Sequence, residues 1–335
     1  MSETWEALPE VSHEPTRLSP DDAFALLGNE TRFDILRALW EATDPHELID
    51  EADESPSHGM GDSHLAIDAV PFSELYNRVE YGDTGNFSYH LEKLLGHFVR
   101  RTDEGYELTE SGFAVARSML VGSDLERSTR GSTPTTADCP GCAHSLEMTY
   151  DAPALWLECD GCEGYWPGEE GMLFRFHLER PGLRNRTPRE CLDAGVVNAV
   201  NRFDSAASGV CPECTGRVHA SLSVCDDHEL VDGCCDTCGG CWLGSLTYVC
   251  YDCKTTIQAP SWAPLLRHPA LVSFYYERGI EHVPDSWDAI CRCIHWREER
   301  HSLDPPRLRV VVLHEGDELR ATIDETGTVV DVDRS

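Results

Sequence analysis

The chain has 335 residues, more than one ordinary hydrophobic core holds, so we expect two or three folded units. Acidic residues number 60 against 27 lysines and arginines, and the formal net charge of −33 excludes a uniformly basic nucleic-acid-binding surface. No apolar run approaches the roughly 20 residues of a membrane span, and the segment MSETWEALPE lacks the pattern of a signal peptide, so we expect no membrane association and a cytoplasmic location.

Arginine predominates among the basic residues: Lys93 and Lys254 are lysines, and the other 25 are arginines. This bias is similar to that of proteins from salt-accumulating haloarchaea, in which a dense carboxylate surface holds water and cations. DNA binding ordinarily gains affinity by releasing condensed counterions, but that gain is small in molar salt. A DNA-binding protein of this kind depends on shape, hydrogen bonds and a local gap in its acidity, so the net charge does not exclude one.

Helical patterns begin after a polar, proline-bearing segment, residues 1–18, which we interpret as a flexible lead-in. Ser19 predicts an N-cap, with Pro20 at the first helical position, and Gly28 predicts the end of that helix. Asn29 predicts the cap of a second helix. Its apolar residues recur at three- and four-residue steps and form one stripe: Phe33, Leu36, Leu39 and Trp40.

Residues 43–70 break the pattern, and their acidic, glycine-bearing composition predicts a mobile surface insertion. A third helix is expected over residues 72–80. After a tight turn over 81–85, the segment NFSYHLEKLLGHF predicts a helix with Phe87, Leu91 and Leu94 inward and Asn86, Tyr89 and Lys93 outward. A hairpin over residues 99–108 and a helix over 109–120 follow.

Helix, helix, turn, helix and hairpin is the order of a winged helix-turn-helix. The segments NETRFDILRAL, FSEL, GNFSYHLEKL and ELTESG closely resemble the ArsR-like group of haloarchaeal regulators, over residues 19–122. The resemblance implies double-stranded DNA as a partner and a homodimer. Many such proteins sense metals through cysteines on the helix before the recognition helix, but FSELYNRVE contains none, so metal sensing at that place is not expected.

In this architecture the second helix of the motif enters the major groove, and its outward residues reach base edges. Those residues here are Asn86, Tyr89 and His90, with Ser88 beside them, while Lys93, Arg100 and Arg101 would contact phosphates. From residue 84 to 101 Glu92 is the single acid against three bases, which supplies the local gap in acidity. The alternative is that these are merely solvated helix positions.

Most of the 16 cysteines form C-x-x-C pairs, which in a long, unsecreted chain indicates metal thiolate rather than disulfides. Residues 123–137 read as a Ser/Thr/Gly-rich linker, and beyond it we expect a zinc-binding domain over 138–335. In its zinc ribbon, residues 138–165, a hairpin around Asp151 to Pro153 would bring two pairs together: Cys139 with Cys142, and Cys159 with Cys162. Free cysteines or redox motifs would not explain two pairs joined by a hairpin.

A second cysteine cluster covers residues 209–256. Sequential pairing is awkward, because the eight extended residues 217–224 separate their ends by about 26 Å. A nested arrangement with a zinc ion at each end of two strands, 217–224 and 242–249, is favoured. One ion would take Cys211, Cys214, Cys250 and Cys253, and the other Cys225, His228, Cys235 and Cys238. Alternatively, His228 is a solvated loop residue and Cys234 or Cys241 is the ligand. The remaining cysteines, Cys191, Cys291 and Cys293, look like ordinary core or surface residues.

Between and after these clusters the pattern predicts a helix over residues 188–207, two further helices in HPALVSFYYERGI and DSWDAICRCIHWREER, and a three-stranded β-meander over 305–334. The expected fold class is therefore α+β: a winged helix-turn-helix, zinc-ribbon hairpins, helices and a small meander. This tail also resembles the C-terminal part of the same haloarchaeal regulators, a resemblance that assigns it no activity.

Together these features predict a sequence-specific DNA-binding transcription regulator with three structural Zn²⁺ ions in a C-terminal sensing or assembly domain. The alternative is a protein-interaction module that docks on the transcription machinery without DNA specificity of its own. No Ser-His-Asp set, phosphate-binding loop or open His/Glu metal site stands out, and His295 beside Cys293 reads as a coincidence of helix faces. We therefore predict that the chain is not an enzyme.

Overall fold

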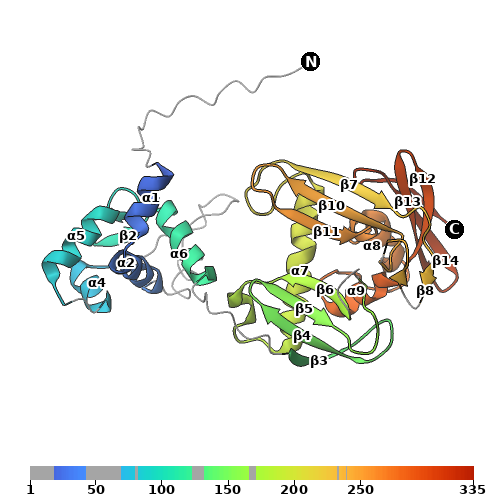
Figure 1. The fold of residues 1–335 in the computed structure, drawn as a ribbon, viewed down its shortest axis with the longest axis horizontal. Helices are drawn as coiled ribbons and strands as arrows, with labels where there is room; N and C mark the ends of the chain where they lie inside the picture. The colour runs from blue at the N-terminus through green and yellow to red at the C-terminus, as the bar shows by residue number, and fades with distance from the viewer. Residues whose placement is uncertain are drawn as a thin grey trace, which may run out of the picture. The chain divides into compact units, whose positions relative to one another are not determined.

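The structure, a computed structural model, describes residues 19–42, 69–79, 82–122, 132–165, 171–231, 234–238 and 240–335. It is a mixed α+β chain that divides into an N-terminal unit, Met1–Ser123, and a C-terminal unit, Asp124–Ser335 (Figure 1). The expected lead-in, residues 1–18, and positions 43–68 of the expected insertion lie outside the described residues. Among the helices described, none is both long and apolar enough to cross a membrane.

The N-terminal unit contains α1 (Pro20–Leu27), α2 (Glu30–Glu41), α4 (Phe72–Val79), α5 (Thr84–Leu94), β1 (Val99–Arg101), β2 (Tyr106–Leu108) and α6 (Glu110–Gly122). The predicted caps are confirmed: Ser19 accepts from the Asp22 N–H and Asn29 from the Arg32 N–H. Helix α5 begins two residues earlier than expected, because the Asp83 side chain caps it at the Gly85 and Asn86 N–H groups.

One residue of the expected insertion has regular pairing. Val70 forms a β-bridge with Tyr106 of β2, with backbone hydrogen bonds of 2.9 and 3.0 Å. The segment that enters α4 is thereby fixed to the hairpin, and the end of the insertion is structured rather than mobile. Behind this contact the rings of Phe72, Tyr76 and Phe87 meet edge to face or stacked, and they join α4 to α5 in one core.

The C-terminal unit opens with an antiparallel sheet in the order β3-β4-β5-β6: β3 (Ser132–Asp138), β4 (Ser145–Asp151), β5 (Ala154–Glu158) and β6 (Met172–His177). The predicted hairpin of β4 and β5 is confirmed. The expected linker is wrong over its second half, because residues 132–137 belong to β3. Its buried Thr135 hydroxyl donates to the Leu146 carbonyl at 2.9 Å, so a polar Ser/Thr composition here serves a paired strand.

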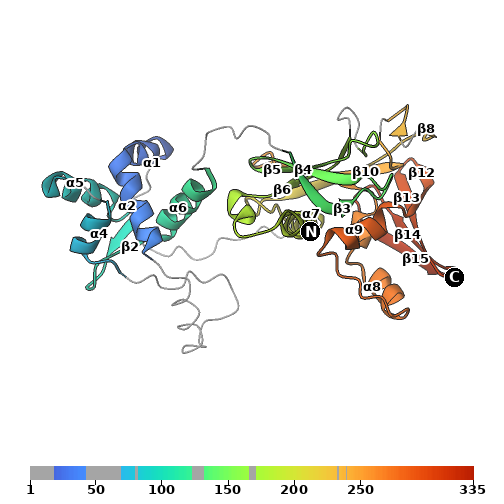
Figure 2. The same cartoon turned by 90° about the horizontal axis from the view of Figure 1, so that it is seen from below.

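A 20-residue helix, α7 (Pro188–Ala207), follows the short 3-10 helix η1 (Arg180–Leu183) and begins at a capping box of Thr187 and Glu190. It was expected between the cysteine clusters, and it packs against both sheets that carry them, contacting β3, β6, β7 and β11. Figure 2 shows α7 and α9 on one face of the β3–β6 sheet.

The second sheet has the order β11-β10-β7: β7 (Val218–Val224), β10 (Gly244–Cys250) and β11 (Thr256–Pro260). A small pair, β8 (Leu230–Val231) and β9 (Cys234–Cys235), lies in the connection between β7 and β10. The chain continues through η2 (Ala263–Leu265), α8 (Pro269–Tyr276) and α9 (Trp287–Ile294).

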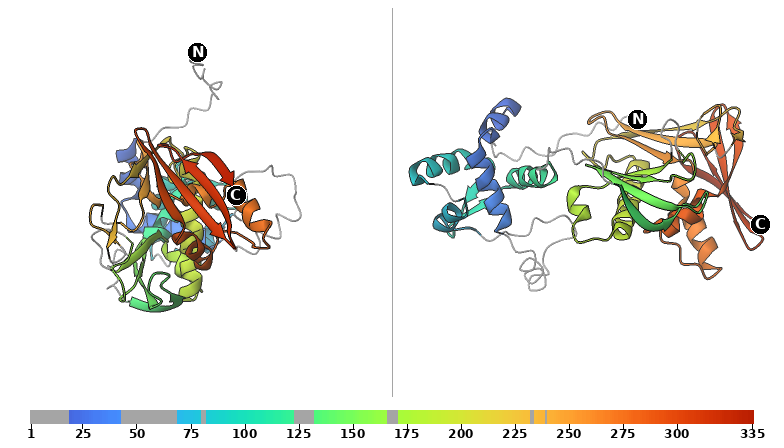
Figure 3. Two further views of the ribbon diagram at one scale, coloured as in Figure 1. Left: turned by 90° about the vertical axis from the view of Figure 1, so that its right-hand side faces the viewer. Right: turned by 60° about the horizontal axis from the view of Figure 1, so that its bottom comes forward.

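The last sheet is four-stranded rather than the expected three-stranded meander: β12 (Arg297–Leu303), β13 (Pro306–His314), β14 (Asp317–Ile323) and β15 (Val329–Arg334), seen toward the viewer at the left of Figure 3. Residues REER were expected to continue the helix, but α9 ends at Ile294 and they pair with β13. Backbone pairing with a neighbouring strand outweighs the helix propensity of Glu and Arg. All three larger sheets share one core rich in tryptophan.

Candidate metal centres and nucleic-acid interface

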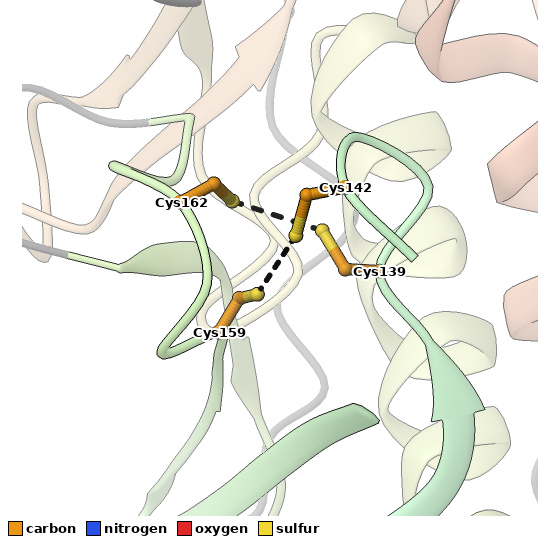
Figure 4. Close-up of side chains that lie close together, drawn as sticks. All are labelled: Cys139, Cys142, Cys159 and Cys162. Carbon is orange, nitrogen blue, oxygen red and sulfur yellow. Dashed lines mark hydrogen bonds between the residues drawn. The ribbon is translucent and has the colours of Figure 1, made fainter. Parts of the chain in front are cut away.

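Four thiols meet at the open end of the β4–β5 hairpin, away from its turn. Cys139 and Cys142 lie in the turn after β3, Cys159 and Cys162 lie after β5, and we call them tetrad 1. Figure 4 shows their sulfurs converging: Sγ of Cys139 lies 3.8 Å from Sγ of Cys162, and Sγ of Cys142 lies 3.4 Å from Sγ of Cys159. Four sulfurs around a tetrahedral ion at about 2.3 Å would lie about 3.8 Å apart. The donor set therefore fits a single metal ion.

The second cluster supplies two more groups. Tetrad 2 is Cys211, Cys214, Cys250 and Cys253, and tetrad 3 is Cys225, His228, Cys235 and Cys238; within each group the candidate ligand atoms lie within 4.8 Å of one another. In tetrad 2 two Sγ–Sγ distances are 3.6 Å, and in tetrad 3 the His228 Nδ1 lies 3.5 Å from Sγ of Cys238. Each tetrad could hold a metal ion, and the donors are compatible with zinc.

The nested pairing of the second cluster is confirmed. Strands β7 and β10 are antiparallel from Val218 opposite Cys250 to Val224 opposite Gly244, so tetrad 2 lies at one end of the strand pair and tetrad 3 at the other. His228 takes part in tetrad 3. Of its alternatives, Cys241 is half-buried outside the tetrads, and the side chain of Cys234 lies outside the described residues.

Three C-x-x-C turns share one backbone geometry. After the second cysteine of each pair the chain enters the left-handed region, with φ of 60° at Ala143, 59° at Thr215 and 66° at Lys254. The N–H of each of these residues donates to the carbonyl of the first cysteine, at 2.8, 2.9 and 3.0 Å. Left-handed backbone costs a residue with a Cβ about 1 kcal/mol or more, so three identical turns indicate a common constraint, the convergence of two thiols. This feature was not predicted from the sequence.

Hydrogen bonding and burial act on the thiols in opposite directions. The backbone N–H of His144 lowers the pKa of Cys142 to about 6, and the hydroxyl of Thr255 lowers that of Cys253 to about 6. Burial raises the pKa of Cys139 and brings that of Cys159 to about 11. Burial also lowers the pKa of His228, which favours the neutral imidazole that a metal ligand must be.

Tetrad 1 is the most deeply set, since Cys139 and Cys159 are buried and its other two members are half-buried. Tetrad 2 has two buried and two exposed cysteines, and tetrad 3 has Cys235 as its buried member and an exposed Cys238. Arg300 of β12 donates to the Cys225 carbonyl at 2.9 Å and fixes one side of tetrad 3. Outside the tetrads, Cys191 and Cys293 are buried and Cys291 is half-buried, as expected for core cysteines.

Helix α5 carries the predicted DNA-facing residues. Phe87, Leu91 and Leu94 are buried in the N-terminal core, whereas Asn86, Tyr89 and Lys93 are exposed on the opposite side. Tyr89 keeps 54% of its surface exposed, and Lys93 Nζ lies 5.5 Å from the centre of its ring. Ser88 is half-buried between the two faces.

His90 was expected to project outward with Asn86 and Tyr89, and this expectation is wrong. Its side chain is 9% exposed and lies toward the core, where burial and then the charge of Arg32 lower its pKa. The physical reason is the helical period: His90 follows Phe87 by three residues and precedes Leu94 by four, so it shares their inward face. A buried, neutral imidazole is a packing residue of the unit rather than a reader of base edges.

The two arginines of β1 are exposed but have partners on β2. Arg100 forms an ion pair with the buried carboxylate of Glu107, its cross-strand neighbour. Arg101 lies over the ring of Tyr106, with its guanidinium carbon 5.8 Å from the ring centre. The hairpin follows α5 in the sequence, and each of its two guanidinium groups is oriented by a residue of β2.

Comparisons with known proteins divide the chain as the structure does. A family model described as "Domain of unknown function (DUF7351)" matches residues 136–329, and one described as "Domain of unknown function (DUF7347)" matches residues 20–119. The first match lies in the C-terminal unit and the second in the N-terminal unit. No curated protein and no solved structure matches the chain.

Proposed function

The chain belongs to the DUF7351 family, whose model matches more than half of it, and we propose that it is a sequence-specific DNA-binding transcription regulator. In this proposal the N-terminal unit is a winged helix-turn-helix that binds double-stranded DNA. The C-terminal unit is a zinc-ribbon domain held by three structural Zn²⁺ ions.

The observation that supports DNA binding is the exposed face of α5. Asn86, Tyr89 and Lys93 stand at i, i+3 and i+7, so they share one side of the helix, and none of them is part of the buried core. The preceding α4 and the following β1–β2 hairpin stand in the order of a helix-turn-helix with a wing. A helix with one face anchored and the other polar can enter a major groove.

The proposed roles follow from side-chain chemistry. Asn86 can pair bidentately with adenine, while Tyr89 can donate to a phosphate or stack on a sugar. Lys93 and Arg101 would contact phosphates. Arg100 would also contact a phosphate while its guanidinium stays paired with the carboxylate of Glu107, which holds the side chain along the hairpin.

Zinc is proposed for the tetrads because thiolate and imidazole donors in tetrahedral sets are those that this ion prefers. Two sets of four thiolates and one of three thiolates with a histidine leave no coordination position for substrate or water, so the ions would be structural. When bound, each would fix two turns of the chain to one another.

The proposal is tested by selecting binding sites from a random pool of duplexes with the full chain in molar potassium chloride, followed by mobility-shift titrations on the selected site. We expect Asn86→Ala to relax specificity at one base pair by about 1–3 kcal/mol. Lys93→Ala should weaken binding to all duplexes alike and lower the salt slope by about 1. Selected sites should be inverted repeats if the regulator acts as the proposed homodimer.

Arg117→Ala, an exposed position on α6, is the matched control and should leave affinity and salt slope unchanged. Failure to enrich any sequence, or equal affinities for Lys93→Ala, Asn86→Ala and the unaltered chain, would refute the regulator. Enrichment of a protein partner from the transcription machinery instead would support the docking-module alternative.

A further inference from the structure

A cavity of about 670 Å³ lies within the C-terminal unit and is lined by residues of β6, α7, β11 and η2. None of its lining residues is a tetrad ligand. Small-molecule sites commonly have volumes of about 300–1,000 Å³, so this cavity has room for a ligand of drug size.

The walls are mainly apolar and include five Phe and Trp rings. Phe174 and Phe176 come from β6, Val200 and Phe203 from α7, and Trp262 from the segment after β11; all five of these residues are buried. Such side chains favour the body of an apolar molecule over a sugar or a nucleotide phosphate, because they offer contact area and few hydrogen bonds.

The basic side chains of the lining are Arg175, His177 and Arg202. No Asp or Glu among the described residues lines the cavity, in a chain whose acids outnumber its lysines and arginines by 60 to 27. His177 and Arg202 have nearby carboxylates, Glu179 at 3.0 Å and Glu213 at 2.5 Å, which lie outside the lining.

Arg175 differs from these two. Its guanidinium carbon lies 5.1 Å from the centre of the Trp156 ring, a second lining residue, and among the described residues Arg175 makes no ion pair. The aromatic face holds the cation at the exposed side of the cavity without neutralising it. The position is therefore suited to a ligand anion.

We propose that this cavity binds a small apolar carboxylate, with its hydrocarbon or aromatic body against Phe174, Phe176 and Phe203 and its carboxylate on Arg175. The site goes beyond DNA binding and would make the C-terminal unit the ligand-binding part of the protein. It does not depend on the regulator proposal, since binding is measured without DNA.

The test uses the full, metal-loaded chain in molar potassium chloride and two probes of similar shape, 1-naphthoate and the neutral 1-naphthalenemethanol, in isothermal titration calorimetry. We expect 1-naphthoate to bind with one site per chain and at least about tenfold tighter than the alcohol, since a charged hydrogen bond contributes about 1.5–3 kcal/mol. Arg175→Gln should weaken 1-naphthoate about tenfold and leave the alcohol unchanged.

Arg184→Gln is the matched control, because Arg184 is exposed in the same unit and does not line the cavity. Ala199→Phe places a ring into the cavity from α7 and should abolish binding of both probes while the chain keeps its metal. No binding of 1-naphthoate, equal binding of the two probes, or equal losses in Arg175→Gln and Arg184→Gln would overturn the proposal.

Discussion

Glu298 is a half-buried carboxylic acid of the C-terminal unit. It stands on β12, where one oxygen accepts from the Leu243 N–H at 2.6 Å and the other accepts from the hydroxyl of Ser261. Burial outweighs these hydrogen bonds and raises the pKa of Glu298 to about 7. The residue therefore binds a proton more tightly in the folded chain than in the unfolded one.

This shift predicts a pH dependence of stability. Because the folded pKa is raised, the stabilising contribution is fully present below the ordinary pKa of about 4.3 and is lost as the pH rises through about 7. We expect unfolding free energy to fall by about 1 kcal/mol from this residue between pH 6 and 8. Glu298→Gln, which stays neutral, should lose that dependence in thermal melts at fixed salt.

Glu299→Gln is the neighbouring control and should keep the pH dependence of the unaltered chain. Equal slopes of Tm against pH in the Glu298→Gln and unaltered proteins would contradict the assignment. The range from pH 6 to 8 is chosen because metal–thiolate bonds are lost in more acidic solution, where protons compete for the ligands.

The sequence predicted which residues group as metal ligands more reliably than it predicted which way a side chain points. The twelve candidate metal ligands group as expected, because C-x-x-C spacing and strand length limit which sulfurs can meet. His90 was assigned to the wrong face, since a histidine at the edge of an apolar stripe is compatible with either side. The left-handed turns at Ala143, Thr215 and Lys254 gave no signal, because these residue types do not themselves prefer that backbone region.

At the scale of elements, α6 depends on a close approach to the segment before β1. A Cβ built on Gly112 would lie 2.0 Å from the carbonyl oxygen of Phe98, which is backbone and cannot move aside easily. The Thr109 hydroxyl also accepts from the Gly112 N–H at 3.1 Å, which fixes this turn of the helix. Glycine is needed here for space.

We therefore expect Gly112→Ala to destabilise the N-terminal unit by about 1–3 kcal/mol, although alanine is the better helix former. Ser111 directly precedes Gly112 and is exposed, so Ser111→Ala should be neutral or slightly stabilising. Urea unfolding followed by circular dichroism measures both. A stabilised Gly112→Ala variant would show that helix propensity, rather than the contact with Phe98, determines the stability of the unit at this position.

Elements with their own start and stop signals were predicted well. Helices α1 and α2 begin at the expected caps, α7 covers the expected residues 188–207, and the β4–β5 hairpin follows its alternating pattern. β3 and β12 were missed because pairing with the next strand in the chain, β4 and β13 respectively, overrides a linker-like or helix-like composition.

At the scale of the whole molecule, all three tetrads belong to the C-terminal unit, and the two units have separate hydrophobic cores. We expect about three zinc ions per chain by elemental analysis after dialysis. Removal by a strong chelator should abolish the cooperative unfolding of the C-terminal unit, because the ligand turns have lost their shared bond.

The N-terminal unit is the internal control for that experiment. Its helical signal and unfolding transition should remain after chelation, since no tetrad residue lies in it. Simultaneous loss of both transitions would show that metal binding supports the whole chain, and a stoichiometry of one or two ions would contradict the three-site assignment.

The nested sheet also sets a length scale. β7 and β10 remain paired over six residue steps, from Val218 opposite Cys250 to Val224 opposite Gly244, which at about 3.4 Å each spans about 20 Å. The paired strands would hold the ions at their two ends at a fixed distance, too far apart for the ions to exchange ligands. If paramagnetic ions replaced the zinc ions of tetrads 2 and 3, a distance measurement between them would therefore give one narrow distribution. Two extra residues in each strand should lengthen this distance by about 7 Å without turning any side chain to the other face.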